Sequence, residues 1–530
     1  MATKILDERE LCDLECLSIG AFAPLSSYMT RAQYESCLDT LKISETDVFP
    51  IPIVCTVAQP LTPGSILTLS SITGTTVATL DVAECWQPDL TREWVSVFGS
   101  DDPNHPYIQY MKSKGPVHYV SGQLAVRPDY AFHPSSFTTE RRTPAELRAL
   151  GPWIGFQTRN PLHRSHVELI RNSVTAGAKL LLHPVEGVTQ ECDVPFPVRM
   201  KCYRQVLPEL PANATLSILP LSMRMAGPRE AVWHAVIRRN YGCSHFIVGR
   251  DHAGPSYKKQ DGTAFYDPLA AQNLAKSMEA DIGITIVTSY EVVFCDKRDP
   301  CYMSIGAAAS LPPGSYEIKN ISGTAFRAML EAGQPVPWWY SYPAVVETLQ
   351  KYYQKPRGLC VYFVGLSGSG KSTLAQALKA GLQEEYPHKE VTVLDADEIR
   401  THLSKGLGFS REDRSTNVRR IGYVASEIVR HGGIVLVANI APFEEDRAAN
   451  RRLIGQYGTY LEVFVDTALE TCEARDVKGL YKAARAGTIK QFTGISDPFE
   501  RPTTAHVLRE QSLADANAEV FALATAALKK

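Results

Sequence analysis

"LCVYFVGLSGSGKSTLAQAL", residues 359–378, decides the fold of the C-terminal third of this chain. A run of apolar residues is followed by the pattern G-x-x-x-x-G-K-[ST] and then by helix-forming residues, which indicates a strand, a phosphate-binding loop and a helix. The glycines let backbone N–H groups turn towards a phosphate, and Lys371 adds a mobile positive charge. A nucleotide-binding α/β domain is therefore predicted for residues 356–530. The residues expected to bind the nucleotide are Gly365, Ser367, Gly368, Ser369, Gly370, Lys371, Ser372 and Thr373, with Ser372 as the Mg²⁺ ligand.

Two carboxylates and several cations follow this loop. The predicted strand in "VTVLDADEIR" (391–400) ends at Asp395 and Asp397, where one of them would orient Mg²⁺ or accept a proton from a hydroxyl nucleophile. Read alone, two aspartates after a strand more often form a turn and a helix cap. "FSREDRSTNVRRIGYVA" (409–425) places Arg414, Asn417 and Arg420 at helical spacing, which on its own would indicate a solvated basic face.

A second polar cluster lies upstream, in "FQTRNPLHRSH" (156–166). It follows the apolar "WIGF" and precedes a predicted helix, so its polar side chains meet the helix N-terminus beyond a sheet edge, where an anion would bind. His163 and His166 are three residues apart, which puts both on one face of the first helical turn with N–H groups able to reach phosphate oxygens. The alternatives are two histidines without a role, or a metal pair, for which no third ligand is evident.

A third motif, "HFIVGRDHAGP" (245–255), brings more polar residues to the same sheet edge. Its predicted strand ends before Arg250, Asp251 and His252, and the flanking Gly249 and Gly254 permit close approach of the backbone.

The remaining segments complete a multidomain α/β architecture. Residues 1–130 alternate short β-rich runs with turns, which predicts a small barrel-like or sandwich domain. Residues 131–290 alternate strands and helices, as in a parallel sheet of Rossmann-like type, and residues 291–355 are expected to form a loop and two helices that close this domain. "YYQKPRG" (352–358) is expected to be the linker to the C-terminal domain.

The composition excludes several classes of protein. With 44% hydrophobic residues, 21% charged residues and a net charge of −2, the chain resembles an ordinary globular protein and shows no basicity that would indicate a nucleic-acid partner. No apolar run approaches the ~20 residues of a membrane span, and the N-terminus lacks a signal peptide, so we expect a cytoplasmic protein without a membrane partner. Its twelve cysteines fit reduced thiols, and Cys295 and Cys301 lack the two further ligands of a structural zinc site.

The C-terminal segment, residues 356–530, resembles the adenylylsulfate (APS) kinase family. The resemblance rests on "GLSGSGKST", "LDADEIR", "FSREDRSTNVRRIGYVA", "FVDTALETCEARDVKGLYKAARAG" and "FTGISDPFERP". It implies transfer of the ATP γ-phosphate to the 3′-hydroxyl of APS, giving PAPS, with Mg²⁺ accompanying ATP. By motif, Asp397 would assist the hydroxyl, Lys478 would lie over the nucleotides, and APS would be held by Arg400, Arg414 and Asn417.

Two positions depart from that family's pattern. Its usual D-G-D-N is here Asp395-Ala396-Asp397-Glu398, and its serine before proline, which can become phosphorylated in relatives, is here Ala441. In-line phosphoryl transfer does not need a covalent serine.

Residues 1–350 closely resemble the ATP sulfurylase (sulfate adenylyltransferase) family through "QTRNPLHRSH", "SMRMAGPREAVWHAVIRRNYGCSHFIVGRDHAGP" and "ISGTAFRAML". The resemblance implies an N-terminal PUA-like domain, a nucleotidyltransferase domain and a small closing domain, and the reaction of ATP with sulfate to give APS and pyrophosphate. Thr158, Arg159 and Asn160 would form the catalytic loop, and His163 and His166 would stabilise the transition state. The substrate-binding residues implied are Gln157, Arg159, Gly249, Arg250, Asp251, His252, Ala253 and Val293, with sulfate on Arg159 and Ala253.

Together the resemblances imply a bifunctional sulfate-activating enzyme, sulfurylase first and kinase second. Its partners would be ATP, sulfate, APS, PAPS and pyrophosphate, without a tightly bound organic cofactor, and it would form a homo-oligomer, a dimer or a hexamer. Three alternatives remain open from the sequence: a kinase-like domain that is only regulatory, a sulfurylase running towards ATP synthesis, and a scaffold that binds nucleotides without catalysis.

Overall fold

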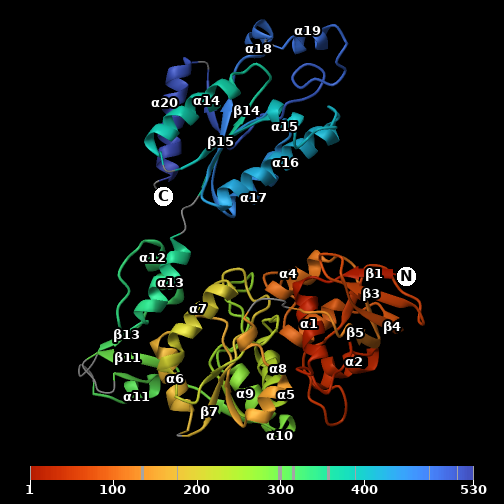
Figure 1. The fold of residues 1–530 in the computed structure, drawn as a ribbon, viewed down its shortest axis with the longest axis vertical. Coiled ribbons are helices and arrows are strands. Elements are labelled where there is room, and N and C mark those ends of the chain that lie inside the picture. The colour runs from red at the N-terminus through yellow and green to blue at the C-terminus, as the bar shows by residue number, and fades with distance from the viewer. Residues whose placement is uncertain are drawn as a thin grey trace. The chain divides into compact units, whose positions relative to one another are not determined.

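The structure is a computed structural model that describes residues 2–132, 137–175, 177–296, 301–312, 317–354, 358–387, 389–476, 478–509 and 511–528 (Figure 1). It divides into two compact units, an N-terminal unit of Met1–Gln354 and a C-terminal unit of Lys355–Lys530, which are described separately below. Residues 355–357 of the predicted linker lie outside the described residues.

The first part of the N-terminal unit is a mixed five-stranded sheet with strand order β1-β3-β4-β5-β2. Strands β1 and β3 pair in parallel and the other neighbours are antiparallel. Four helices accompany this sheet, so the segment is less purely β than its sequence predicts. Its elements are β1 (Ala2–Ile5), α1 (Glu8–Ser18), α2 (Arg31–Thr40), β2 (Cys55–Val57), β3 (Ile66–Ser70), β4 (Thr76–Trp86), α3 (Leu90–Phe98), α4 (Pro106–Ser113) and β5 (His118–Val126).

A parallel five-stranded sheet with order β10-β9-β6-β7-β8 forms the centre of this unit. The motifs at 157–160 and 249–254 follow β6 and β9, which are neighbours, so both motifs lie at the carboxyl edge of the sheet. Its elements are α5 (Pro144–Leu150), β6 (Trp153–Phe156), α6 (Arg164–Ser173), β7 (Lys179–Leu182), α7 (Phe196–Val206), β8 (Thr215–Leu216), α8 (Gly227–Asn240), β9 (Cys243–Val248), α9 (Ala270–Ser277), α10 (Glu279–Ile282) and β10 (Thr285–Thr288). Two short 3₁₀ helices span Thr138–Glu140 and Leu207–Glu209.

Helix α8 joins these two parts into one hydrophobic core. Trp233 of α8 is fully buried, and its ring lies 5.2 Å from Phe22 and 6.5 Å from Phe49, both of which belong to the N-terminal part. The two parts therefore share packed side chains and are not separate cores.

A small closing segment ends the N-terminal unit. It contains the antiparallel sheet β12-β11-β13, formed by β11 (Val292–Asp296), β12 (Tyr302–Ser304) and β13 (Glu317–Lys319). The two expected helices are α12 (Gly323–Glu331) and α13 (Pro343–Tyr353), and α11 (Ile305–Ala309) precedes them.

The C-terminal unit is a parallel sheet, order β15-β16-β14-β17-β18, with helices on both faces (Figure 1). All seven residues of β14 are buried: Leu359, Val361 and Phe363 face α14 and α20, and the alternate residues face α16. A strand covered on both faces reads as an unbroken apolar run, which explains the sequence signal. Its elements are β14 (Gly358–Val364), α14 (Lys371–Glu385), β15 (Val391–Asp395), α15 (Ala396–Thr401), α16 (Arg411–Arg430), β16 (Ile434–Ala438), α17 (Glu444–Gly455), β17 (Gly458–Val465), α18 (Leu469–Arg475), α19 (Leu480–Arg485), β18 (His506–Leu508) and α20 (Leu513–Leu528).

Candidate functional site

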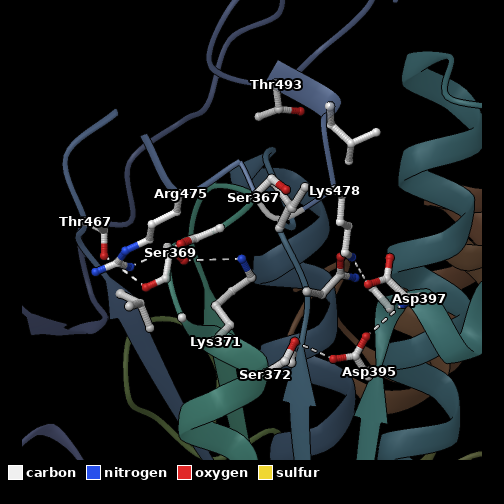
Figure 2. Close-up of a pocket in the computed structure, with 18 of the residues that line it drawn as sticks. Ser367, Ser369, Lys371, Ser372, Asp395, Asp397, Thr467, Arg475, Lys478 and Thr493 are labelled. Atoms are coloured by element: carbon white, nitrogen blue, oxygen red, sulfur yellow. Dashed lines mark hydrogen bonds and ion pairs between the residues drawn. The ribbon is translucent and has the colours of Figure 1, made fainter. Parts of the chain in front are cut away.

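The loop between β14 and α14 forms one wall of a pocket of about 890 Å³ in the C-terminal unit (Figure 2). Gly365 has a φ of +150°, and a Cβ there would lie 2.7 Å from the Val465 carbonyl oxygen, so the loop passes close to β17 only because this residue is glycine. The loop residues Ser367–Thr373 all line the pocket, as the sequence predicts for a phosphate-binding loop.

Three side chains hold the loop from outside through consecutive carbonyl groups. Tyr481 donates to the Ser367 carbonyl at 2.9 Å, Arg475 to Gly368 at 3.2 Å and Thr467 to Ser369 at 3.0 Å (Figure 2). None of the three was predicted as a site residue, although all lie in the segment "FVDTALETCEARDVKGLYKAARAG" that carries the kinase resemblance.

Lys371 begins α14 with its side chain in the pocket wall. Its Nζ donates to the Leu366 carbonyl at 2.6 Å and to Ser369 Oγ at 3.3 Å, so the ammonium group lies within the curve of the loop. Burial lowers the pKa of Lys371 to about 8, because the loss of hydration of the ammonium group outweighs the attraction of nearby Asp395 and Asp397. An anion bound in the loop would restore that charge balance.

The two predicted carboxylates lie beside the loop and have different partners. Asp395 accepts a hydrogen bond from Ser372 Oγ at 2.5 Å and one from the Asp397 N–H at 2.9 Å, so it also caps α15. Asp397 forms an ion pair with Lys478 (Figure 2). The Ser372 hydroxyl and the Asp395 carboxylate are adjacent oxygen donors of the kind that Mg²⁺ prefers, so these residues fit a nucleotide-bound Mg²⁺.

The predicted cations Arg400 of α15 and Arg414 of α16 also line the pocket. Arg400 stacks on Phe409, with its guanidinium 4.4 Å from the ring centroid, and Arg414 donates to Thr493 Oγ1 at 2.8 Å and pairs with Asp497. Phe409 and Thr493 also line the pocket, although neither was predicted as a site residue.

Two other residues of α16 have different surroundings. Asn417 is buried, and its Oδ1 has no hydrogen-bond partner among the described residues, which leaves an acceptor towards the pocket. Arg420, also at helical spacing, instead donates to the Leu403 carbonyl at 3.1 Å.

In the N-terminal unit, Arg159 joins the two motifs at the carboxyl edge of the central sheet. Its Nη2 donates to the Gly254 carbonyl at 3.1 Å, and its Nη1 donates to Asp193 Oδ2 at 3.0 Å and to Met225 Sδ at 3.7 Å. Asp193 is mostly buried and was not predicted, because it lies in a loop 34 residues downstream of Arg159.

The other residues of the predicted catalytic loop make local bonds. Thr158 Oγ1 donates to the Asn160 carbonyl at 2.8 Å and accepts the Asn160 N–H at 3.1 Å, which closes a tight turn. Gln157 donates to Met223 Sδ at 3.8 Å, and its buried Oε1 has no hydrogen-bond partner among the described residues.

His163 and His166 lie at the start of α6, with ring centroids 5.7 Å apart. Burial, followed by the neighbouring His166, lowers the pKa of His163 to about 3, and burial lowers that of His166 to about 4, so both are neutral at pH 7. His163 Nδ1 lies 2.9 Å from Ser341 Oγ, and His166 Nδ1 accepts the His163 N–H at 3.1 Å. Because Nδ1 of His166 is an acceptor, its proton lies on Nε2, which can donate to an oxygen without a formal charge.

The turn at 249–254 has an unusual backbone. Asp251 and Ala253 both have left-handed conformations, with φ of +51° and +55°. His252 points inward to His234 of α8, whereas Arg250 points outward and pairs with Glu291 at 2.7 Å. The structure thus brings His252 and Ala253 near Arg159 and turns the Arg250 side chain towards the closing segment. Val293 of β11 is buried in a small apolar cluster with Cys295 and Ala308.

The residues that the structure describes contain no group of three or more His, Cys, Asp and Glu side chains placed to hold a metal ion, Cys295 and Cys301 included. Within the same described ranges, no helix has the length and apolar character needed to cross a bilayer.

Comparisons with known proteins agree with this geometry. Family models match a PUA-like domain at residues 1–128, ATP-sulfurylase at residues 138–352 and adenylylsulphate kinase at residues 357–510. The chain is 39% identical to a sulfate adenylyltransferase of Mycosarcoma maydis, over 98% of this chain and 93% of that protein. It is 40% identical to the sulfate adenylyltransferase of Emericella nidulans, over 96% of this chain and 90% of that protein. A solved structure titled hexameric APS kinase from Thiobacillus denitrificans is 29% identical, with a TM-score of 0.73 over 98% of this chain and 92% of that one.

Proposed function

We propose, from the premise that this chain belongs to the sulfate adenylyltransferase family and carries an adenylylsulfate kinase domain, that it activates sulfate in two successive reactions. The N-terminal unit converts ATP and sulfate into APS and pyrophosphate. The C-terminal unit transfers the γ-phosphate of a second ATP to the 3′-hydroxyl of APS and forms PAPS. The formation of APS is strongly unfavourable. A second site that consumes APS therefore draws the first reaction forward.

In the first reaction a sulfate oxygen attacks the α-phosphorus of ATP while the bond to the bridging oxygen of pyrophosphate breaks. Arg159 and the Ala253 backbone would hold the sulfate, and Gln157 would contact ATP. The neutral rings of His163 and His166 would donate N–H groups to the phosphates, where negative charge increases in the transition state. Thr158 and Asn160 would fix the conformation of the loop, as their mutual hydrogen bonds support.

The nucleotide would occupy the turn after β9. The peptide groups from Gly249 to Ala253 would line its pocket, together with Val293, and Arg250 would close it from the side of Glu291. The left-handed residues of this turn support such a role, because strained backbone is retained where it places N–H groups for a ligand.

In the second reaction the 3′-hydroxyl of APS attacks the γ-phosphorus in line, and ADP leaves. Asp397 would accept the hydroxyl proton once Lys478 turns from it towards the phosphates. Lys371 and the backbone of the loop would bind the transferred and leaving phosphates. Ser372 and Asp395 would hold the Mg²⁺ of ATP, which neutralises charge on the phosphate oxygens.

The acceptor nucleotide would lie against the α15 and α16 residues of the same pocket. Arg400 with Phe409 offers a cation and an aromatic face, and Arg414 and Asn417 offer a donor and an acceptor. The observation that carries the proposed kinase activity is that the phosphate loop, the carboxylates Asp395 and Asp397, and the polar side chains of α15 and α16 all line one pocket.

A C-terminal domain that is only regulatory is less well supported. The departure that suggested it, Ala441, has a fully buried methyl group that packs in the core formed with Ile421 and Val437, so it faces away from the nucleotides. The other departure replaces a glycine by Ala396 and an amide by Glu398, and leaves Asp395 and Asp397 in the pocket.

We also propose that the chain forms a homo-oligomer, a dimer or a hexamer. The neighbour from Thiobacillus denitrificans is titled hexameric, and it covers both units of this chain. A reducing compartment such as the cytoplasm suits the twelve cysteines, all of which are thiols in the described residues.

The test uses the full chain in two assays, pyrophosphate release from MgATP and sulfate, and transfer of γ-label from ATP to APS. Arg159→Ala should abolish the first and spare the second, and Lys371→Ala should do the reverse. Arg171→Ala on the surface of α6 and Lys379→Ala on α14 are matched controls that should leave both rates unchanged. Label transfer that survives Lys371→Ala, or its absence from the unmodified chain, would refute the proposed kinase.

A further inference from the structure

We infer that Glu230 and His234 of α8 are positioning residues of the sulfurylase site, which act by fixing the two backbone turns that hold Arg159. The inference rests on the proposed function of that site. Both lie in a segment that carries the family resemblance, but neither was assigned a role in the site from the sequence. Both are fully buried and lie four residues apart, on one face of α8.

The first turn, at 222–226, is held by Glu230. One carboxylate oxygen accepts the Arg224 N–H at 2.9 Å and the other accepts the Ala226 N–H at 2.8 Å. Between these two N–H groups lies Met225, whose left-handed φ of +60° needs such support. Met225 Sδ in turn accepts a hydrogen bond from Arg159.

The second turn, at 250–254, is held by His234. His234 Nδ1 lies 3.0 Å from His252 Nε2, and His252 stands between the left-handed residues Asp251 and Ala253. The Gly254 carbonyl of this turn accepts the second hydrogen bond of Arg159. The start of α8 adds a bond of its own, because the Gly227 N–H donates to the Ala253 carbonyl at 3.1 Å.

The atoms around His234 indicate which ring nitrogen of His234 and of His252 carries the hydrogen. His234 Nε2 lies 3.4 Å from the Glu230 carboxylate, which only a protonated nitrogen can face favourably. His234 Nδ1 is then an acceptor, and His252 Nε2 donates to it. His252 therefore presents its Nδ1 lone pair on the other side, where it can accept from a hydroxyl or amino group of the nucleotide and cannot donate to a phosphate.

One helix face thus connects both turns around the guanidinium of Arg159. Sulfate and ATP must meet with their reacting atoms aligned, and small displacements of a cationic donor reduce the rate of such a reaction strongly. A displacement of about 1 Å caused by a mutation away from the reacting atoms can lower the rate by about 100-fold.

The experiment compares His234→Asn with His234→Phe in the full chain. Asparagine retains an acceptor at the position of Nδ1, whereas phenylalanine retains the ring shape and removes the acceptor. We expect kcat for sulfate-dependent pyrophosphate release to fall ~10–100-fold in His234→Phe and no more than ~3-fold in His234→Asn, with the KM for MgATP changed less than kcat. Glu230→Gln should behave like His234→Phe, because its NH₂ group faces a backbone N–H.

Two controls separate positioning from a general loss of structure. The kinase rate of each variant should equal that of the unmodified chain, because that site lies in a unit with its own core. Glu230→Gln combined with Arg159→Lys should lose little more than Arg159→Lys alone, because both changes act on the same group. If His234→Phe does not fold, as judged by tryptophan fluorescence, the inference is tested with Glu230→Gln, whose kcat and kinase rate are judged by the same criteria.

The results discriminate between the possibilities. A His234→Phe variant within twofold of the unmodified chain, equal losses in the asparagine and phenylalanine variants, or additive losses in the double variant would overturn the inference. An unmodified chain without sulfate-dependent pyrophosphate release would instead refute the proposed function of the site.

Discussion

Lys371 shows how burial at a single residue controls a whole site. Its ammonium group is enclosed by the loop and bonded to the Leu366 carbonyl, and its pKa is lowered to about 8. The same cause, acting on His163 and His166, keeps those rings neutral in the other site. Both sites therefore have protonation states that differ from those of the same side chains in water.

We predict that kcat/KM for MgATP in the kinase reaction falls above pH 8, approaching tenfold per pH unit. Above its pKa of about 8, Lys371 of the free protein loses the proton that attracts the phosphates. The kinase assay at saturating APS, from pH 7 to 9.5, measures this. Lys371→Arg is the control, because a guanidinium stays charged in this range and its remaining activity should not fall. A profile that is level to pH 9.5 in the unmodified chain would show that Lys371 keeps its proton.

At the scale of elements, β14 and α14 were predictable because the apolar run, the loop motif and the helix-forming residues all indicate the same strand, loop and helix. Every residue of β14 is buried, the loop motif follows at once, and the helix begins at Lys371. The sheet of β11, β12 and β13 was not predicted, because strands of three to five residues give too short a pattern to distinguish from loops.

Site residues, too, were predictable only where a local sequence motif marks them. Arg159 and His252 follow strands and were predicted as site residues from their motifs, whereas Arg414 and Asn417 were assigned to the APS site only through the family resemblance. Asp193 was missed, because it meets Arg159, which lies 34 residues before it in the sequence, only in the folded chain. A pattern within one segment carries no information about such contacts.

We predict that Gly422→Ala destabilises the C-terminal unit by about 1–3 kcal/mol. A Cβ at this position of α16 would lie 1.9 Å from Oδ1 of Asn450 on α17. Asn450 cannot easily move away, because it is buried and donates to the Val418 carbonyl at 3.0 Å. Urea unfolding followed by loss of kinase activity measures the effect.

Gly455→Ala, at the end of α17, is the matched control. A Cβ there meets nothing within 4 Å, so we expect no destabilisation. The tryptophan fluorescence transition should be the same in both variants, because all six tryptophans lie in the N-terminal unit. Equal urea midpoints for the loss of kinase activity in Gly422→Ala and Gly455→Ala would contradict the prediction, because they would mean that α16 and α17 can move apart without a loss of stability.

At the scale of the whole molecule, the N-terminal unit contains a set of buried titratable groups that make its stability depend on pH. Among its described residues, the N-terminal unit has six histidines with lowered pKa values, caused first by burial: His105, His163, His166, His183, His234 and His252. Three of its buried carboxyl groups have raised pKa values, also caused first by burial: Asp13, Glu93 and Glu230.

We predict that the N-terminal unit loses stability steeply as the pH falls from 6.5 to 4.5. Each histidine binds a proton in the unfolded chain near pH 6.5 but only well below pH 6.5 in the folded one, so acid favours unfolding by up to about 1.4 kcal/mol per pH unit per group. The carboxyl groups act oppositely, because the folded chain keeps their protons, but six histidines outweigh three carboxyl groups. Urea midpoints from tryptophan fluorescence at pH 7.5, 6 and 5 measure this. A midpoint that does not fall by pH 5 would contradict it.

The presence of both units on one polypeptide has a consequence for the cell that makes it. Each round of translation yields one adenylyl-transfer site and one phosphoryl-transfer site, so their numbers stay equal whatever the level of expression. A cell that needs more of one activity than the other cannot obtain it by changing transcription of this gene. The balance between making APS and consuming it must therefore be set by the turnover rates of the two sites.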